Sequence, residues 1–198
     1  YGAVVLNNPH NATGQIFNEN EVKNLLKWLL QRNIYVIDDL SYQNVTPSNE
    51  FKIIKTLRQL ADELEEEGYI TKEQSNNVIT IHSMSKTDSY AGARLSVAEI
   101  RNKKLFNKLN EINSTIKPNI AAIFLSYLFY RNRAENINAY YRLRNKIFLE
   151  RSNALLEAVN NLPGVRNKYS IIIKPPSGSM YPQLIIEKLP SGLSLDWL

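Results

Sequence analysis

The sequence predicts an α/β protein: a three-layer α/β/α arrangement around a mostly parallel sheet, followed by the start of a smaller α+β domain. Three observations predict this fold. Short apolar runs alternate with helical patterns from residue 3 to residue 81, as in the β-α-β units of parallel sheets. Each of these runs ends in polar residues that suit loops. A strand-turn-strand pattern then follows a long helical segment near the end of the sequence.

The first forty residues predict a strand, a helix and a second strand. Residues 3–6 form an apolar run that ends at a turn-forming Asn-Asn-Pro sequence. Apolar residues at helical spacing predict a helix from residue 20 or 21 to residue 32, with Asn18 or Asn20 as its N-cap. A second apolar run, residues 34–37, is expected to stop at Asp38 and Asp39.

The middle of the chain continues the pattern. A helix is predicted over residues 51–67 and a third strand over residues 78–81. A strand over residues 95–100 then leads into helices at 101–112 and 119–130. In open α/β sheets, ligands bind beside the carboxyl ends of the strands, so the loops after the first three strands are the places to look for a site.

A long helix over residues 135–161 is expected to bridge two domains. It ends before the helix-breaking residues 162–164. Strands at 170–173 and 180–186 flank the Pro-Pro-Ser-Gly turn at 175–178 and predict a hairpin of the smaller domain.

The composition excludes several classes of protein. With 198 residues, 43% hydrophobic and 22% charged, the chain is neither disordered, collagen-like nor a coiled coil. The best apolar run, Ile120 to Tyr130, is interrupted by Ser126 and is too short to cross a bilayer, so we expect a soluble protein without a membrane partner. The absence of cysteine excludes thiol chemistry, and His10 and His82 lack supporting acids, so we predict no metal site. The cytoplasm is the default compartment.

The charge distribution does not predict a nucleic-acid partner. The net charge is +5, and residues 101–151 hold eleven Lys and Arg against three acids. Those bases alternate with apolar residues at helical spacing, which is typical of the solvated face of amphipathic helices. The chain also starts without Met directly on a strand, and we therefore interpret it as a fragment.

Chemically useful side chains gather in three loops. The loop from Ser83 to Arg94 contains hydroxyls, Lys86, a glycine and an arginine, which can bind a phosphate and leave an amine free as a nucleophile, although a solvated loop is equally expected. Asp39 and Tyr42 follow the second strand, where a capping Asp and a packing Tyr are the simpler interpretation. The first loop, residues 8–14, is by itself only a polar turn.

Together, in this order and spacing, the three loops resemble those of the fold type I pyridoxal-phosphate enzymes, specifically the class I and II aminotransferases. The family's first signature is Asn-Pro-x-Asn-Pro-Thr-Gly, and five of its six constrained positions agree with Asn8-Pro9-His10-Asn11-Ala12-Thr13-Gly14. The second is an Asp three residues before a Tyr. The third is Ser-x-Ser-Lys followed by Gly-x-Arg, which is met by Ser83, Ser85, Lys86, Gly92 and Arg94.

The resemblance implies the roles of two catalytic residues. Lys86 would form the Schiff base with pyridoxal 5'-phosphate, and its freed amine would then move the proton between the substrate α-carbon and the cofactor. Asp39 would face the pyridine nitrogen, where a carboxylate favours the protonated ring and makes the cofactor a better electron sink. Removal of Asp39 is therefore expected to lower the reaction rate more than the affinity for the cofactor.

The resemblance also implies how the cofactor would be held. Tyr42 and Asn11 would hydrogen-bond the phenolic oxygen of the ring, and Tyr42 thereby takes part in catalysis. Ser83, Ser85 and Arg94 would bind the phosphate, for which the planar guanidinium is well suited.

The match covers the second half of the large pyridoxal-phosphate-binding domain, which we expect at residues 1–140. The linking helix and the start of the small domain are expected at residues 141–198. Ala12 stands where the family usually has proline, and Ser96 where a glycine often follows the arginine. The stretch at residues 46–77 is longer than expected for the family and predicts a surface insertion with an acidic helix.

The leading hypothesis is an aminotransferase that moves an amino group from an L-amino acid to a 2-oxo acid. A lyase or decarboxylase of the same fold is an alternative, because the same lysine, aspartate and phosphate cup serve several reactions. A third is a non-catalytic pyridoxal-phosphate-sensing domain of a transcription regulator. The family also implies a homodimer, and groups that complete its site lie outside this chain, so we do not expect the chain to be active alone.

Overall fold

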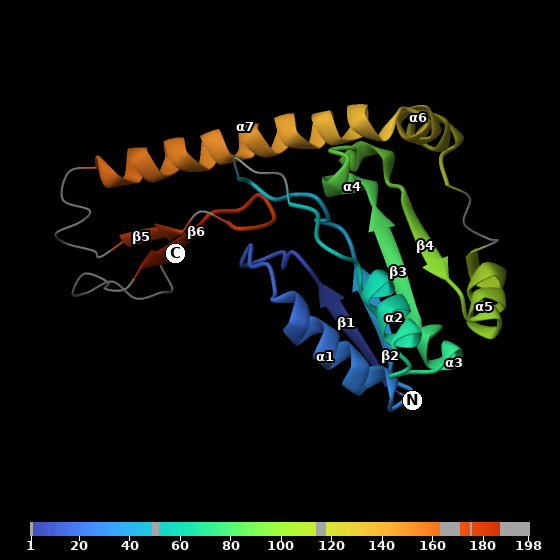
Figure 1. Ribbon diagram of the computed structural model, residues 1–198. Coiled ribbons are helices and arrows are strands. Elements are labelled where there is room, and N and C mark those ends of the chain that lie inside the picture. The colour runs from blue at the N-terminus through green and yellow to red at the C-terminus, as the bar shows by residue number, and fades with distance from the viewer. Residues whose placement is uncertain (1, 49–51, 114–117, 163–170, 175, 187–198) are drawn as a thin grey trace.

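A four-stranded sheet forms the centre of the structure, in the order β1-β2-β3-β4. The strands are β1 (Ala3–Asn7), β2 (Tyr35–Asp39), β3 (Val78–Ser83) and β4 (Ser96–Ile100). The first three are parallel, and β4 is antiparallel to β3, which confirms the predicted mostly parallel sheet. This computed structural model describes residues 2–48, 52–113, 118–162, 171–174 and 176–186 (Figure 1).

The prediction that Asp38 and Asp39 end the second strand is wrong, because both residues belong to β2. Their backbones pair with Leu6 and Asn7 of β1. The buried carboxylate of Asp38 has a partner, since the backbone N–H of Leu57 donates to its Oδ2 at 2.8 Å. Burial nevertheless raises the pKa of Asp38 to about 7, because an apolar environment disfavours the charged form.

Helices α1 (Glu19–Leu30) and α2 (Leu57–Glu66) lie against one face of the sheet (Figure 1). The main core joins the apolar faces of both helices to Val36 and Val78 of the sheet. The core side chains from α2 are Leu57, Leu60, Ala61 and Leu64. Each buried leucine of this kind contributes about 1.5–3 kcal/mol to stability.

The packing of α2 corrects the prediction of a surface insertion at residues 46–77. Its apolar residues recur at i, i+3, i+4 and i+7, so they form one stripe that faces the core while the acidic residues face solvent. Helix α2 also starts later than predicted: Thr56 is its N-cap in a capping box with Gln59. A short helix, α3 (Lys72–Ser75), follows and is not predicted by the sequence pattern.

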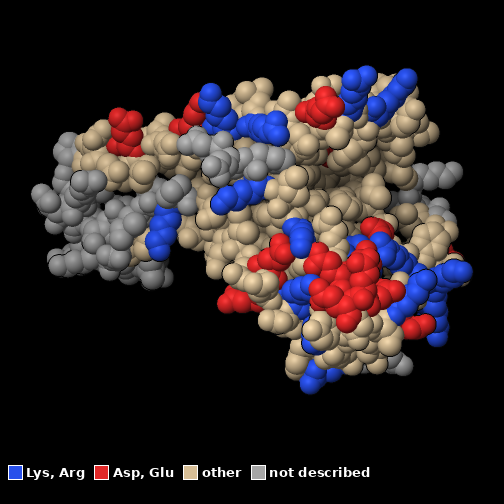
Figure 2. Space-filling model, in the orientation of Figure 1, with Lys and Arg blue, Asp and Glu red and all other residues tan. Residues whose placement is uncertain are grey.

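The acidic residues of α2 form a conspicuous patch on the surface (Figure 2). Two lysines from outside the helix form ion pairs with these acidic residues. Lys23 forms ion pairs of 2.9 Å with Glu63 and 2.7 Å with Glu67, and Lys55 contacts Glu63 at 2.7 Å. The patch is therefore partly neutralised by the chain itself, although exposed pairs of this kind contribute little to stability.

The second half of the chain is mainly helical, as predicted. Helices α5 (Lys103–Asn113) and α6 (Ile120–Tyr130) precede α7 (Ala134–Asn160), which runs from α6 toward a two-stranded antiparallel sheet (Figure 1). That sheet consists of β5 (Ile171–Lys174) and β6 (Gln183–Ile186), which confirms the predicted hairpin. The helix-breaking Pro163 and Gly164, and also Ser170 and Pro175, lie outside the described residues.

The proposed domain boundary at residue 140 falls within α7, which is continuous there, and the division stays a prediction. Within the described ranges, no helix combines the length and apolar character needed to span a membrane.

Candidate functional site

The three candidate loops meet at one edge of the sheet because β1, β2 and β3 end side by side. In the strand register, Asn7 is the partner of Asp39, and Asp39 is the partner of Ile81. The side chain of Asn7 ties two loops together: its Nδ2 donates to the carbonyl oxygen of Asp39 at 2.8 Å, and its Oδ1 accepts from the backbone N–H of Asn11 at 2.7 Å. The Asn11 side chain is exposed at this edge.

The first loop is fixed by a close contact with the turn before β6. Gly14 has a φ of 62°, and a Cβ atom there would lie 2.6 Å from both the Gly178 carbonyl oxygen and Pro176 Cβ. The Gly178 N–H donates to the Gly14 carbonyl oxygen at 2.7 Å. Position 14 of the loop therefore requires glycine both for its backbone conformation and for space. Among the described peptide bonds, Asn8–Pro9 is cis and Asn11–Ala12 is trans.

The second loop carries the carboxylate and the phenol that the sequence singles out. Asp39 Oδ1 accepts from the backbone N–H of Ser41 at 3.0 Å and from its hydroxyl at 2.5 Å, so the turn holds the carboxylate in place. Tyr42 is buried, and burial raises the pKa of its phenol. The phenol of Tyr42 therefore remains protonated at neutral pH.

The third loop begins with a short helix, α4 (Met84–Thr87), that carries Lys86. Ser83 is its N-cap, and the Ser83 side chain accepts from the N–H of Ser85 at 3.4 Å. The Thr87 hydroxyl donates to the carbonyl oxygen of Leu40 at 3.1 Å, which joins α4 to the second loop. Lys86 is half-buried, so its side chain remains accessible to a ligand.

Arg94 ends the same loop, after a short 3-10 helix, η1 (Ala91–Ala93). Its φ of 51° is unusual for a residue other than glycine, and such conformations concentrate at functional sites. The N–H of Met84 donates to the Leu95 carbonyl oxygen at 3.3 Å, which places Arg94 at the same edge as Ser83. Arg94 is exposed, and its guanidinium donates to the Ala91 carbonyl oxygen at 3.2 Å.

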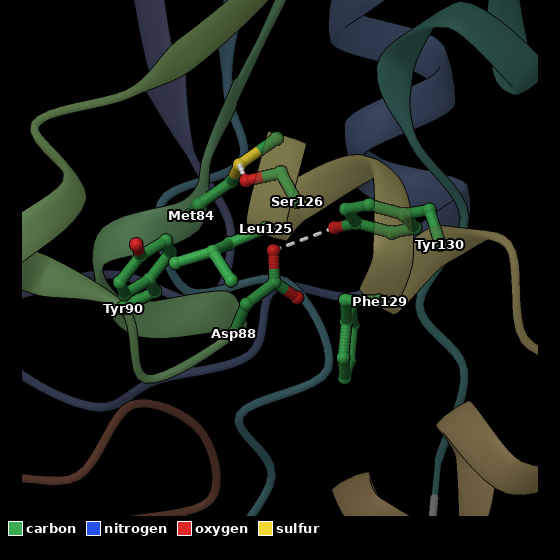
Figure 3. Close-up of a pocket in the computed structure, with 7 residues that line it drawn as sticks. All are labelled: Met84, Asp88, Tyr90, Leu125, Ser126, Phe129 and Tyr130. Carbon is green, nitrogen blue, oxygen red and sulfur yellow. Dashed lines mark hydrogen bonds between the residues drawn. The ribbon is translucent and has the colours of Figure 1, made fainter. Parts of the chain in front are cut away.

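An unpredicted cluster surrounds Asp88, two residues after Lys86. The hydroxyl of Tyr130 donates to Asp88 Oδ2 at 2.6 Å (Figure 3), and that of Tyr141 donates to Oδ1 at 2.8 Å. The hydroxyl of Tyr140 donates to the Asp88 carbonyl oxygen at 3.1 Å. Burial raises the pKa of Tyr130 and Tyr141, so both phenols keep the proton that they donate. The sequence offers no local signal for these contacts.

Arg144 of α7 joins the second and third loops and is also missed by sequence reasoning. Its guanidinium is buried and donates to the carbonyl oxygens of Thr87 and Asn44, the latter at 2.5 Å. Asn145 Nδ2 donates to the same Asn44 oxygen at 2.9 Å. The segments that carry Lys86 and Tyr42 are therefore both held by α7.

A further phenol, Tyr181, reaches the site from the segment before β6. The hydroxyl of Tyr42 donates to the hydroxyl of Tyr181 at 3.5 Å. This hydrogen bond and the nearby Lys86 lower the pKa of Tyr181. A nucleophilic amine, a carboxylate, two phenols and a guanidinium thus share one edge of the sheet. Such a set can bind a phosphorylated aromatic aldehyde and move protons beside it. In the part of the chain that the structure describes, no group of three or more acids and histidines could hold a metal ion.

Comparison with known proteins identifies the family. The family model described as "Aminotransferase class I and II" matches residues 2–189. The chain belongs to this aminotransferase family. The aspartate aminotransferase of Bacillus sp. (strain YM-2) is 23% identical over 183 residues, which cover 90% of the chain and 40% of that protein. The aspartate aminotransferase of Sulfolobus acidocaldarius is 27% identical over 113 residues, or 57% of the chain and 24% of that protein.

Solved structures show the same aminotransferase-family fold. The aspartate aminotransferase of Thermus thermophilus with maleate has a TM-score of 0.69 at 19% identity, over 92% of this chain and 42% of that one. The pyridoxal-phosphate-bound C-S lyase of Staphylococcus hominis has a TM-score of 0.68 at 18% identity, over 90% of this chain and 40% of that one. The predicted family and fold class are confirmed, and the chain spans about 40% of the length of such relatives. The roles of individual site residues stay predictions.

Proposed function

We propose that the full-length protein containing this chain is a pyridoxal-phosphate-dependent aminotransferase that moves an amino group from an L-amino acid to a 2-oxo acid. The observation that carries the proposal is the position of Lys86 on α4, at one sheet edge with Asp39, Tyr42 and Arg94, in a chain of the aminotransferase family. The types of donor group at this edge fit pyridoxal phosphate. When bound, this cofactor supplies an electron sink that stabilises negative charge on the substrate α-carbon.

Each predicted site residue has a role in this proposal. Ser83, Ser85 and Arg94 bind the phosphate group, and Asp39, already oriented by Ser41, holds a proton on the ring nitrogen. Tyr42 and Asn11 orient the ring through its phenolic oxygen. Lys86 accepts the proton from the substrate α-carbon and returns it during turnover.

A lyase is the second candidate, and the similarity to a C-S lyase of the same fold supports it. A C-S lyase breaks a carbon–sulfur bond of its substrate, whereas an aminotransferase removes only the amino group and the α-proton, so product analysis separates the two reactions. Aspartate is the first donor to test, because several relatives are named aspartate aminotransferases. A homodimer and a cytoplasmic location are parts of the proposal that sedimentation analysis and cell fractionation would test.

The primary experiment labels the reactive lysine in the full-length protein. Pyridoxal phosphate is added, the near-visible absorbance band is recorded, and borohydride reduction followed by peptide mapping locates the modified residue. We expect the label on Lys86 in the wild type and no label at that peptide in Lys86→Ala. Lys72→Ala, which changes an exposed lysine of α3, is the control and should still be labelled on Lys86. A label on another lysine, or no band, would contradict the proposal.

A further inference from the structure

Tyr181 is held at the reactive edge of the sheet by a segment that belongs to the predicted small domain. The ring of Tyr181 packs edge-to-face on Tyr42, with ring centroids 6.2 Å apart and an angle of 65°. Its oxygen receives a hydrogen bond from the Tyr42 hydroxyl at 3.5 Å. Lys86 lies near the same hydroxyl group and contributes to lowering the pKa of Tyr181. The remaining surface of Tyr181 is open, with 41% of the residue exposed.

The turn before Tyr181 has little freedom to move. A Cβ atom on Gly178 would lie 2.3 Å from Pro9 Cβ, so this backbone lies directly on the first loop. The hydrogen bond from the Gly178 N–H to Gly14 fixes the same contact from the other side. The position of Tyr181 beside Lys86 is thus determined by backbone packing as well as by its own hydroxyl.

Ser179, between Gly178 and Tyr181, marks this turn as strained. Its φ is 58°, and its hydroxyl is fully buried without a hydrogen-bond partner among the described residues. Both features cost free energy, and they persist in proteins where surrounding structure enforces them, often at functional sites. The strain therefore favours a functional reason for the geometry that brings Tyr181 to the site.

We propose that Tyr181 is an additional catalytic residue, whose hydroxyl oxygen accepts a hydrogen bond from the Lys86 amine and holds that amine for proton transfer. The inference rests on the proposed function. In the step concerned, the Cα–H bond of the substrate breaks, the proton moves to Lys86 Nζ, and the electron pair stays with the substrate carbon. Protonation makes the amine a stronger hydrogen-bond donor to Tyr181, so the contact strengthens as the proton arrives.

The surroundings of the Tyr181 hydroxyl have a measurable consequence without cofactor. The bond from Tyr42, with the nearby Lys86, lowers the pKa of Tyr181, because donors stabilise a phenolate. Ultraviolet titration of the cofactor-free full-length protein, minus that of Tyr181→Phe, isolates this ionisation. We expect its midpoint below the ordinary value of about 10 and a rise of the midpoint in a Lys86→Ala background. The same subtraction with Tyr69→Phe, which removes an exposed phenol, serves as the control.

The kinetic test uses the full-length protein with its cofactor. We expect Tyr181→Phe to slow exchange of the substrate α-proton with solvent, and kcat, by about tenfold or more, the scale of one hydrogen bond to a charged group. KM should change less than about twofold, and Tyr69→Phe should behave as the wild type. Retention of the near-visible band in Tyr181→Phe would verify that the variant folds and binds the cofactor.

The two experiments separate the possible failures. Unchanged α-proton exchange in Tyr181→Phe would overturn the proposed role, even if the titration verified the contact with Lys86. A Tyr181 midpoint that does not move in the Lys86→Ala background would also overturn it. Failure of borohydride to label Lys86 would instead contradict the proposed function, and the titration would still decide whether the two side chains interact.

Discussion

Replacement of Arg144 by methionine should destabilise the two loops that carry Lys86 and Tyr42. The guanidinium is 5% exposed and donates to the carbonyl oxygens of Thr87 and Asn44. Methionine keeps most of the buried hydrocarbon of the arginine side chain but none of its N–H donors. The expected loss of stability therefore comes mainly from the missing hydrogen bonds.

The magnitude follows from the acceptors that remain. Hydrogen bonds to a charged group contribute about 1.5–3 kcal/mol each. The Asn44 oxygen keeps its bond from Asn145, whereas the Thr87 oxygen loses its guanidinium partner. Burial lowers the pKa of Arg144, which shows that desolvation offsets part of the gain. We therefore expect Arg144→Met to lower the free energy of unfolding by about 2–4 kcal/mol.

The assay is denaturant unfolding of the full-length protein, combined with titration of pyridoxal phosphate. Arg142→Met is the matched control, because Arg142 is exposed on the same helix. It should change stability by less than about 0.5 kcal/mol. The free energy of unfolding of Arg144→Lys should fall between those of the two methionine variants, because an ammonium group keeps the charge but cannot reproduce the planar array of donors of a guanidinium. Equal unfolding midpoints and cofactor affinities for Arg144→Met and Arg142→Met would refute the reasoning.

Three further predictions concern the sheet edge and its support. Asp39→Asn should lower kcat on the order of 100-fold while changing the Kd for pyridoxal phosphate only slightly, as steady-state kinetics and a binding titration would reveal; an equal loss of both would contradict the assigned role. Because burial raises the pKa of Asp38 to about 7, the folded state binds this proton more tightly than the unfolded state. The contribution of Asp38 to stability should therefore fall as pH rises from about 4 to 7, and urea unfolding at several pH values should show a flatter dependence in Asp38→Asn. Gly178→Ala should lower the free energy of unfolding by about 1–3 kcal/mol through overlap with Pro9, whereas Gly2→Ala, with nothing within 4 Å of the added Cβ, should leave the thermal unfolding midpoint unchanged.

The elements that the sequence predicts correctly are those that depend on local patterns. The helical spacing of apolar residues locates α1 and α7 to within about two residues. Short apolar runs locate β1 and β3. The start of α2 is placed too early, because its boundary depends on the Thr56 capping box rather than on apolar spacing.

The role of α2 in the core is a less local property. The sequence predicts an acidic helix here, and the surface of α2 is indeed acidic (Figure 2). Whether its apolar stripe meets a partner depends on α1 and the sheet, which supply Leu26, Leu30 and Val36. The burial of Asp38 has the same origin, because its hydrogen-bond donor at Leu57 comes from the start of α2.

The sequence by itself determined the family and the edge of the sheet where the site lies, because the motif residues directly follow three parallel strands. Only the tertiary structure decided which residues surround Lys86. Tyr42 and Tyr181 are 139 residues apart, and the Asp88–Tyr141 bond spans 53 residues. No local pattern encodes such pairs, because their contact arises from the packing of α7 and the turn before β6 onto the sheet edge.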